Sequence, residues 1–220
     1  MEEKPAGAGF GRILISYALW AQWGEIAVQQ EGNARAARSD LVALHRRGID
    51  PAPSMLTELL ASMVAISAAA HALDALYGQL VSPEIKASGP RDGTRREAHI
   101  RECLKRRFDT GKRDSDWAVQ FRQLFDLRDA AVHAEVKDVP SVPHPSGVTN
   151  AGQVNADYSA GEAVKAVDLM LDVLNTCQRG PKSSDAGAKA WAVSFGPSVK
   201  SLAAMLSVSR DALPLVVYEA

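Results

Sequence analysis

The sequence predicts an all-α fold, a single helical bundle of five to seven helices, from three observations. Apolar residues recur at helical spacing in several long stretches, and alanine is used heavily, which favours helix over sheet. The alternation of Val and Ile that strands need is scarce. A chain of 220 residues is long enough for a sizeable core, so we expect one domain over residues 1–220.

Two helices are expected near the N-terminus. Residues 1–9 are interpreted as a flexible tail, and its acidic character argues against a signal peptide. The first helix is predicted over 10–30 and the second over 33–47, with Asn33 as N-cap and Gly48 as the residue that stops it. Arg38 of the second helix is assigned to a solvated face.

The longest predicted helix covers residues 54–80 and is expected at the centre of the bundle, because its many alanines allow close approach on several sides. His71, inside this apolar stretch, is interpreted as a core histidine paired with Asp74. An earlier apolar run, 13–28, is interrupted by polar residues and predicts a core helix, not a membrane span. We therefore expect no membrane partner and a cytoplasmic location.

A strongly basic helix follows, opened by a capping box of Thr94 and Glu97. A solvated face is the ordinary interpretation of such a run of charge. The functional interpretation is a patch that binds the RNA backbone, with Arg101, Lys105 and Arg106 as the candidate contacts.

The stretch from Trp117 to His133, WAVQFRQLFDLRDAAVH, predicts the helix of greatest interest. Arg128 falls in the middle of its apolar face, where an unpaired charge is costly. It therefore needs a buried partner, or an opening to a cleft or a subunit interface. The apolar members of that face are Trp117, Phe121, Leu124, Phe125, Ala131 and Val132.

His133 closes this helix, and a Pro-rich loop runs from there to about Tyr158. Loops of that length inside a compact domain are often functional. His144 within it is interpreted as a loop residue that could cover a site near His133.

Two more helices are expected in the last third of the chain. A capping box of Ser159 and Glu162 opens one that runs to Cys177. Residues 197–206 form the other, within a C-terminal extension over 178–220.

Composition narrows the classes of function. The net charge is −1, so binding of any polyanion needs a local patch. Cys103 and Cys177 lie far apart within helical patterns and are expected to be reduced, partly buried thiols. The sequence shows no metal-ligand spacing, and GAGFG at 7–11 lacks the preceding strand of a dinucleotide fingerprint. We expect neither a metal nor a cofactor.

The string LFDLRDAAVH with its Pro-rich loop resembles the signature of HEPN domains, which are all-α bundles. Their motif is an Arg, four to six residues, and a His that closes a helix. Arg128 matches the Arg, Asp129 the polar residue that follows it, and His133 the His. The motif covers six residues, and its supporting context about forty.

The resemblance implies a metal-independent endoribonuclease, possible roles being a toxin or a phage-defence effector. It also implies a homodimer in which two Arg/His pairs share one cleft, with RNA as substrate and an antitoxin protein as a further partner. Histidine can act as base or acid near neutral pH, and arginine offers a fork of donors to phosphate oxygens. Attack by the 2′-hydroxyl would give a 2′,3′-cyclic phosphate and a 5′-hydroxyl.

The geometry of the motif carries a constraint. Five residues on an ideal helix lie about 140° apart, so Arg128 and His133 do not share a face unless the helix breaks or a second subunit contributes. Asp129 does share the face of His133 and could orient its imidazole. Where the family commonly has Asn, Asp129 would also raise the pKa of the imidazole. Glu135 stands where one toxin–antitoxin branch of the family has Tyr.

A non-catalytic interpretation remains open. Arg128 would then form a structural ion pair with Asp74 or Glu58, and His133 would be a helix-terminal residue favoured by the helix dipole. The protein would be a HEPN-like bundle that binds a protein partner or a nucleotide.

Overall fold

The computed structural model describes residues 18–87, 94–132 and 141–216. Its helices and strands follow in chain order: α1 (Leu19–Arg46), α2 (Ala52–Leu80), α3 (Pro83–Ala87), α4 (Arg96–Arg107), α5 (Arg113–Val132), β1 (Ser141–Pro143), β2 (Asn150–Gly152), α6 (Gln153–Asp157), α7 (Ala160–Arg179) and α8 (Ala186–Ala212). Six helices in this part of the chain have twelve or more residues, and β1 and β2 form one small antiparallel sheet. The predicted all-α bundle is confirmed.

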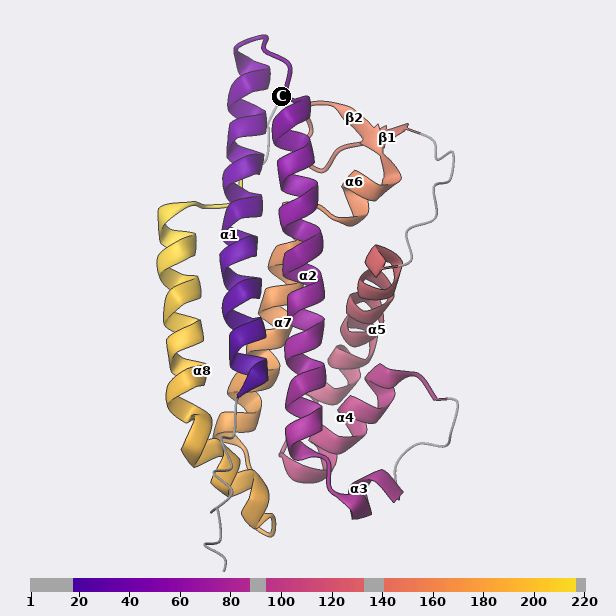
Figure 1. Cartoon of the computed structure of the whole chain (residues 1–220), viewed down its shortest axis with the longest axis vertical. Helices are drawn as coiled ribbons and strands as arrows, with labels where there is room; N and C mark the ends of the chain where they lie inside the picture. The colour runs from indigo at the N-terminus through magenta and orange to yellow at the C-terminus, as the bar shows by residue number, and fades with distance from the viewer. Residues whose placement is uncertain (1–17, 88–93, 133–140, 217–220) are drawn as a thin grey trace, which may run out of the picture.

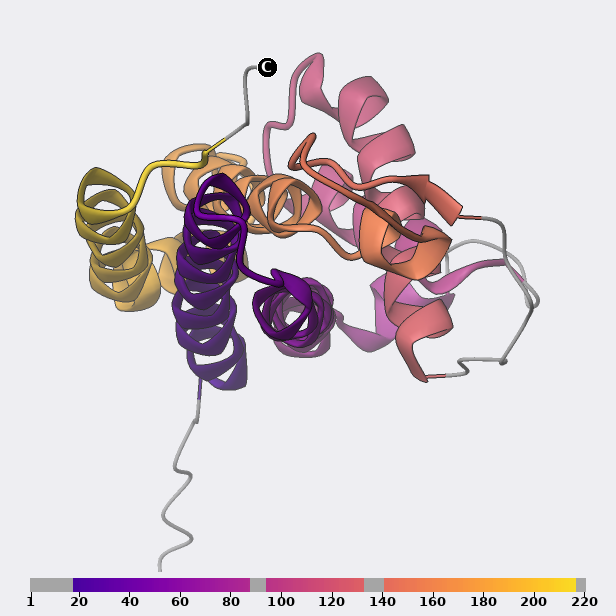
Figure 2. The ribbon, with the colours of Figure 1, turned by 90° about the horizontal axis from the view of Figure 1, so that it is seen from above.

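The long helices run side by side (Figure 1). α1 and α2 form an antiparallel hairpin, α7 packs against both of them from behind, and α8 packs beside α1 and α7. On the other side of α2 lie α4 and α5, and the hairpin β1–β2 with α6 lies near the start of α2. The view from above shows that α1 and α2 share a side that no other helix of the described residues covers (Figure 2).

The two helices predicted at the N-terminus are one continuous helix, α1, so the predicted break at Asn33 is wrong. The glycines within it make room for α8. A Cβ on Gly24 would lie 2.8 Å from Leu202 Cδ1, and one on Gly32 would lie 2.8 Å from Ser209 Oγ. Gly48, with a φ of 68°, follows the end of α1 as predicted.

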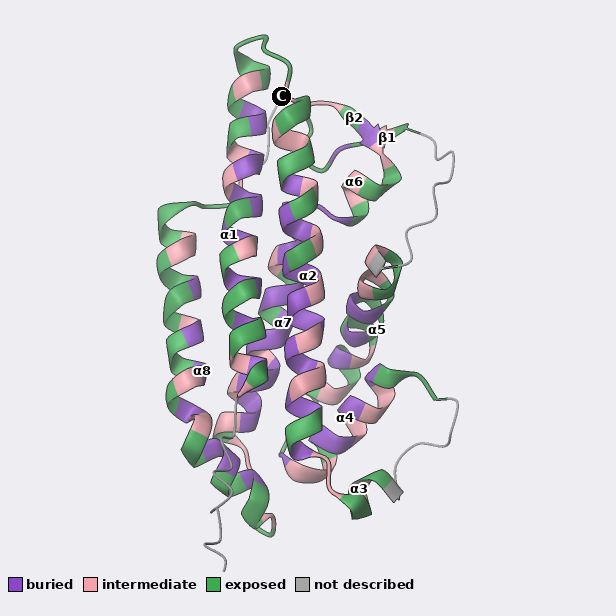
Figure 3. Cartoon of the chain, viewed as in Figure 1, coloured by how far each residue is buried: buried purple, intermediate pink, exposed green. Residues whose placement is uncertain are grey.

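The core is centred on α2, whose bounds agree with the prediction (Figure 3). Its inward alanines are almost fully buried and let α1 and α7 approach closely. By length and composition α2 is also apolar enough to cross a membrane, although 56% of its most apolar window is buried inside the bundle.

An aromatic cluster joins α8 to the same core. Trp20 and Trp191 have ring centroids 5.7 Å apart, and both indoles donate to Gln79 Oε1. The last helix, α8, is much longer than the predicted 197–206, and Pro197 lies inside it. Its apolar side chains extend the core instead of forming a separate layer.

Neither predicted capping box forms. α4 begins after Arg95 without a side-chain cap, and the hydroxyl of Ser159, the N-cap residue of α7, makes no capping bond. At α7 the backbone N–H of Ala160 donates instead to Glu58 Oε1, at 2.8 Å. A carboxylate from α2 thus occupies the N-terminus of α7, where the helix dipole stabilises negative charge.

Candidate functional site

The apolar face predicted for α5 is confirmed for four of its six members, whereas Ala131 is half-buried and the side chain of Val132 lies outside the described part. Trp117, Phe121, Leu124 and Phe125 are all buried, and the Trp117 indole donates to Asp172 Oδ2 on α7 at 2.9 Å. The rings of Phe121 and Phe125 lie nearly parallel. This face fixes the rotation of α5, and Arg128 follows it by one further turn.

Arg128 is held by its own helix. Its guanidinium stacks over the Phe125 ring, 4.6 Å from the centroid, and its Nε donates to Asp129 Oδ1 at 2.9 Å. The Arg128 side chain is 17% exposed and the Asp129 side chain is 58% exposed. The prediction that Arg128 pairs with Asp74 or Glu58 is therefore wrong. Asp74 accepts a hydrogen bond from Arg96, and Glu58 accepts one from Arg38.

His133, the second half of the motif, lies outside the described residues. The predicted contact between Asp129 and His133 therefore stays a prediction. In the structure the Asp129 carboxylate accepts hydrogen bonds from Arg128. A hydrogen bond from a residue outside the helix also holds the end of α5. The Tyr158 hydroxyl donates to the carbonyl oxygen of Leu127 at 2.6 Å.

The three residues predicted to contact RNA lie at the far end of α5 from Arg128. Arg101 donates to the carbonyl and the carboxylate of Asp114, and Lys105 Nζ lies 3.8 Å from that carboxylate. Arg106 donates to Glu102 on its own helix. Since Asp114 and Arg128 are fourteen residues apart on one helix, about 21 Å separates these contacts from Arg128.

Two other arginines lie nearer to Arg128, because α4 runs antiparallel to α5. Arg95, just before α4, donates to Asp126 at 2.6 Å, and both side chains are more than half exposed. Arg96 donates to Asp74 and stacks over the Tyr77 ring. Positive charge near Arg128 therefore comes from the start of α4.

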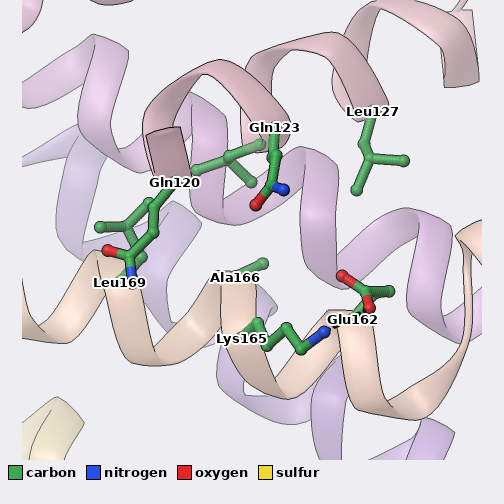
Figure 4. A pocket seen from close by; sticks show the side chains of 8 residues that line it. Gln120, Gln123, Leu127, Glu162, Lys165, Ala166 and Leu169 are labelled. Atoms are coloured by element: carbon green, nitrogen blue, oxygen red, sulfur yellow. Dashed lines mark hydrogen bonds and ion pairs between the residues drawn. The ribbon is translucent and has the colours of Figure 1, made fainter. Parts of the chain in front are cut away.

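A groove of about 260 Å³ separates α5 from α7 (Figure 4). Gln120 and Gln123 line it from α5, and Glu162 and Lys165, which form an ion pair, line it from α7. A second hollow of about 330 Å³ shares Gln123 and Glu162 with it and adds two more carboxylates, Asp126 and Asp157. The groove is thus rich in amides and carboxylates, which disfavours a polyanion inside it.

The structure also shows a buried cluster that the sequence interpretation missed. Arg38 is 1% exposed, so its assignment to a solvated face is wrong. It donates twice to Glu58, with Nε 2.8 Å from Oε2, and Glu58 is itself fully buried. The readable signal was Glu58, which is the only Asp, Glu, Lys or Arg between residues 51 and 73 and so needs a partner.

His144 completes this cluster and is not a surface loop residue. It is 2% exposed, its Nδ1 accepts the Ser146 N–H, and its Nε2 lies 3.9 Å from Glu58 Oε2. Burial lowers the pKa of His144 below its usual value, with Arg38 adding to the effect and Glu58 opposing it. The buried imidazole thus packs the loop after β1 against Glu58 of α2.

A second buried network joins α1 to the end of α8. Arg35, 1% exposed, donates to Glu31 and to the backbone and hydroxyl oxygens of Ser209. Arg210 donates to Glu31 and Asp168. These bonds hold the C-terminal end of α8 against α1, and Arg35 is buried beneath them.

The two cysteines and His71 pack within the fold. Cys103 and Cys177 are free and buried, and burial raises the pKa of Cys103 to about 11, so its thiol is a poor nucleophile. His71 stacks on Trp23, with centroids 4.9 Å apart, and its predicted partner Asp74 binds Arg96 instead. Among the described residues no group of three or more His, Cys, Asp or Glu could hold a metal ion.

Comparisons with known proteins give no relative. No family model matches the chain, and no curated protein or solved structure matches it.

Proposed function

We propose that the protein is a HEPN-like, metal-independent endoribonuclease of the toxin or phage-defence type. Arg128 binds the scissile phosphate, His133 transfers protons, and Asp129 positions them. The observation that carries the proposal is the state of Arg128. It lies at the end of a rigid, well-packed helix, with its guanidinium oriented by Phe125 and Asp129 and still partly open to solvent.

In the ion pair of Arg128 and Asp129, a phosphate can replace the carboxylate as the partner of the guanidinium. Because the Asp129 carboxylate is exposed, the ion pair contributes about 1 kcal/mol or less. A phosphate offers the guanidinium a stronger bidentate partner. Asp129, once released, lies four residues before His133 and can accept a hydrogen bond from its imidazole.

Proton transfer then needs an acid and a base on opposite sides of the phosphate. One histidine removes the proton of the 2′-hydroxyl, and a second protonates the leaving 5′-oxygen. Since each chain supplies one His133, a dimer brings both to one site. The cation that stabilises the charged transition state is Arg128, so no metal ion takes part.

Exposed arginines near Arg128 supply the electrostatic contact with the RNA backbone. Arg95 and Arg96 form solvent-exposed ion pairs, which phosphates displace at small cost. Arg101, Lys105 and Arg106 contact only RNA that extends along α4, about 21 Å from Arg128.

An RNA cleavage assay in EDTA tests the proposal. Wild type cleaves, and Arg128→Ala and His133→Ala each lose at least about a hundredfold in rate with unchanged helical circular dichroism. Arg122→Ala, an exposed arginine of the same helix, is the matched control and keeps its activity. If wild type cleaves no RNA and its expression is harmless, the catalytic assignment is wrong.

The second candidate is a non-catalytic bundle that binds a protein partner or a nucleotide. It is favoured by one observation, that the Nε and one Nη of Arg128 already have a partner within the chain. In that case Arg128→Ala lowers stability slightly and changes no activity. The same pair of assays, cleavage and unfolding, separates the two candidates.

A further inference from the structure

The side of α1 and α2 that no described helix covers carries exposed apolar side chains in one stripe. On α2, Leu56 and Leu60 are each 55% exposed and Val64 is 45% exposed. Their spacing of four residues aligns them along the helix. On α1, Trp23 and Ile26 are more than a third exposed, and Trp23 stacks on His71 of α2. Figure 3 shows that α1 and α2 both have exposed positions on the side that faces the viewer.

The α2 part of this side is almost free of charge. Between residues 51 and 73 the chain has one Asp, Glu, Lys or Arg, and that residue, Glu58, points into the core and is fully buried. A helix face in permanent contact with water normally carries charged side chains. The stripe on α2 favours a partner surface that carries little charge, because an unmatched buried charge is costly.

A groove lies directly beside the stripe. It has a volume of about 490 Å³ and runs between α1 and α2, where small side chains, Ala36, Ala37 and Ala61, leave space. Leu60 and Val64 form one edge of it, and Asp40 is the only charged residue among those that line it. The same face therefore holds both an apolar ridge and a hollow that fits such a ridge.

We propose that this face is the interface with a second copy of the chain, formed around a two-fold axis. In a two-fold contact each copy presents the same patch, so the patch must complement itself. An apolar ridge next to a hollow whose lining has a single charged residue, Asp40, has this property, with Leu60 of each copy entering the groove of the other. Trp23 lies further along the stripe, and tryptophan is enriched at the centres of stable interfaces.

The inference deepens the proposed function, since that function needs two copies of the Arg128 end. Figure 2 shows that the end of α5 reaches the same side of the molecule as the uncovered face of α1 and α2. Pairing through this face brings the two α5 ends to the rim of one interface. The apolar stripe and the groove beside it are features of the fold that do not depend on RNA cleavage.

Mass measurement on the full chain tests the interface. Wild type is a dimer at about 10 µM in light scattering or sedimentation. Leu60→Glu and Leu60→Lys each raise the dissociation constant at least about a hundredfold, because two like charges meet at the axis. Mixing the two variants restores a dimer. Val193→Glu, at a residue of α8 that is 81% exposed, leaves the dimer intact and is the matched control.

Two results would overturn the interface: a monomeric wild type, and a Leu60→Glu variant that stays dimeric with native circular dichroism. If the monomeric wild type also floats with phospholipid vesicles in a Leu60-dependent way, the face is a membrane contact instead. Cleavage separates this inference from the proposed function. A dimer without cleavage overturns the function alone, and a monomeric Leu60→Glu variant that cleaves RNA as wild type overturns the link between the two.

Discussion

Arg38 and Arg128 are both arginines on long helices, both bind a carboxylate, and they differ in what surrounds that carboxylate. Arg38 and Glu58 are sealed from solvent, and Glu58 also accepts the first N–H of α7 and faces His144. Arg128 binds an exposed Asp129 on the next residue of the same helix. A sealed pair links four parts of the fold, whereas an open pair can change partners. The burial of the acid therefore separates a structural arginine from a candidate functional one.

The largest effect is expected at the sealed pair. Glu58→Ala leaves the Arg38 guanidinium and the Ala160 N–H without a partner inside the core, which costs about 3–5 kcal/mol of the free energy of unfolding. Urea unfolding followed by circular dichroism measures it. The double variant Arg38→Met/Glu58→Leu removes both charges and recovers much of the loss. A Glu58→Ala protein that unfolds like wild type would show that this pair is not structural.

Arg128 should behave in the opposite way. Arg128→Ala loses at least about a hundredfold in RNA cleavage, because the cation on the phosphate is gone. Its free energy of unfolding falls by only about 1 kcal/mol, since the pair with Asp129 is exposed. Cleavage rate and urea unfolding on the same preparation check both statements. A drop in stability as large as that of Glu58→Ala, with cleavage unchanged, would make the two arginines alike.

The response to pH sharpens the comparison further. Burial in the folded state keeps the pKa of His144 below its usual value near 6.5. The stability that the neutral, buried imidazole contributes is therefore present above about pH 6.5. It is lost as pH falls from there towards the lowered pKa, by up to about 1.4 kcal/mol per pH unit. Unfolding curves between pH 7 and pH 5 should show this slope, and His144→Asn should flatten it. An equal slope in wild type and variant would mean that another group titrates.

The smallest effects are expected among the arginines and lysines of α4. Arg95→Ala should reduce the slope of log binding constant against log salt by about one unit, because it removes one phosphate contact near Arg128. Lys105→Ala, about 21 Å away, should leave binding of a short RNA unchanged. Titrations of a labelled short RNA at several salt concentrations measure both. The reverse order would place the RNA along α4, where Arg101, Lys105 and Arg106 lie.

Much of the fold was predictable because it depends on local sequence. The apolar period of α5 identified its buried face, Gly48 marked the end of α1, and alanine content identified α2 as the central helix. The predictions that failed involve contacts between distant parts of the chain. Gly32 and Asn33 resemble a helix boundary until Ser209 of α8 packs against Gly32. Ser159 resembles a side-chain cap, but the capping oxygen comes from Glu58, 102 residues away.

The sequence by itself determined the helical class, the apolar face of α5 and the place of Arg128 on it, because these follow from side-chain period and residue type. Only the tertiary structure decided which arginine is sealed and which is open. The sequence pattern predicted a solvated Arg38 and an Arg128 on an apolar face, and the elements that pack around each arginine reversed that order of burial. Burial is a property of that packing, so the cost of an unpaired charge, and with it the role of each arginine, becomes visible only in the folded bundle.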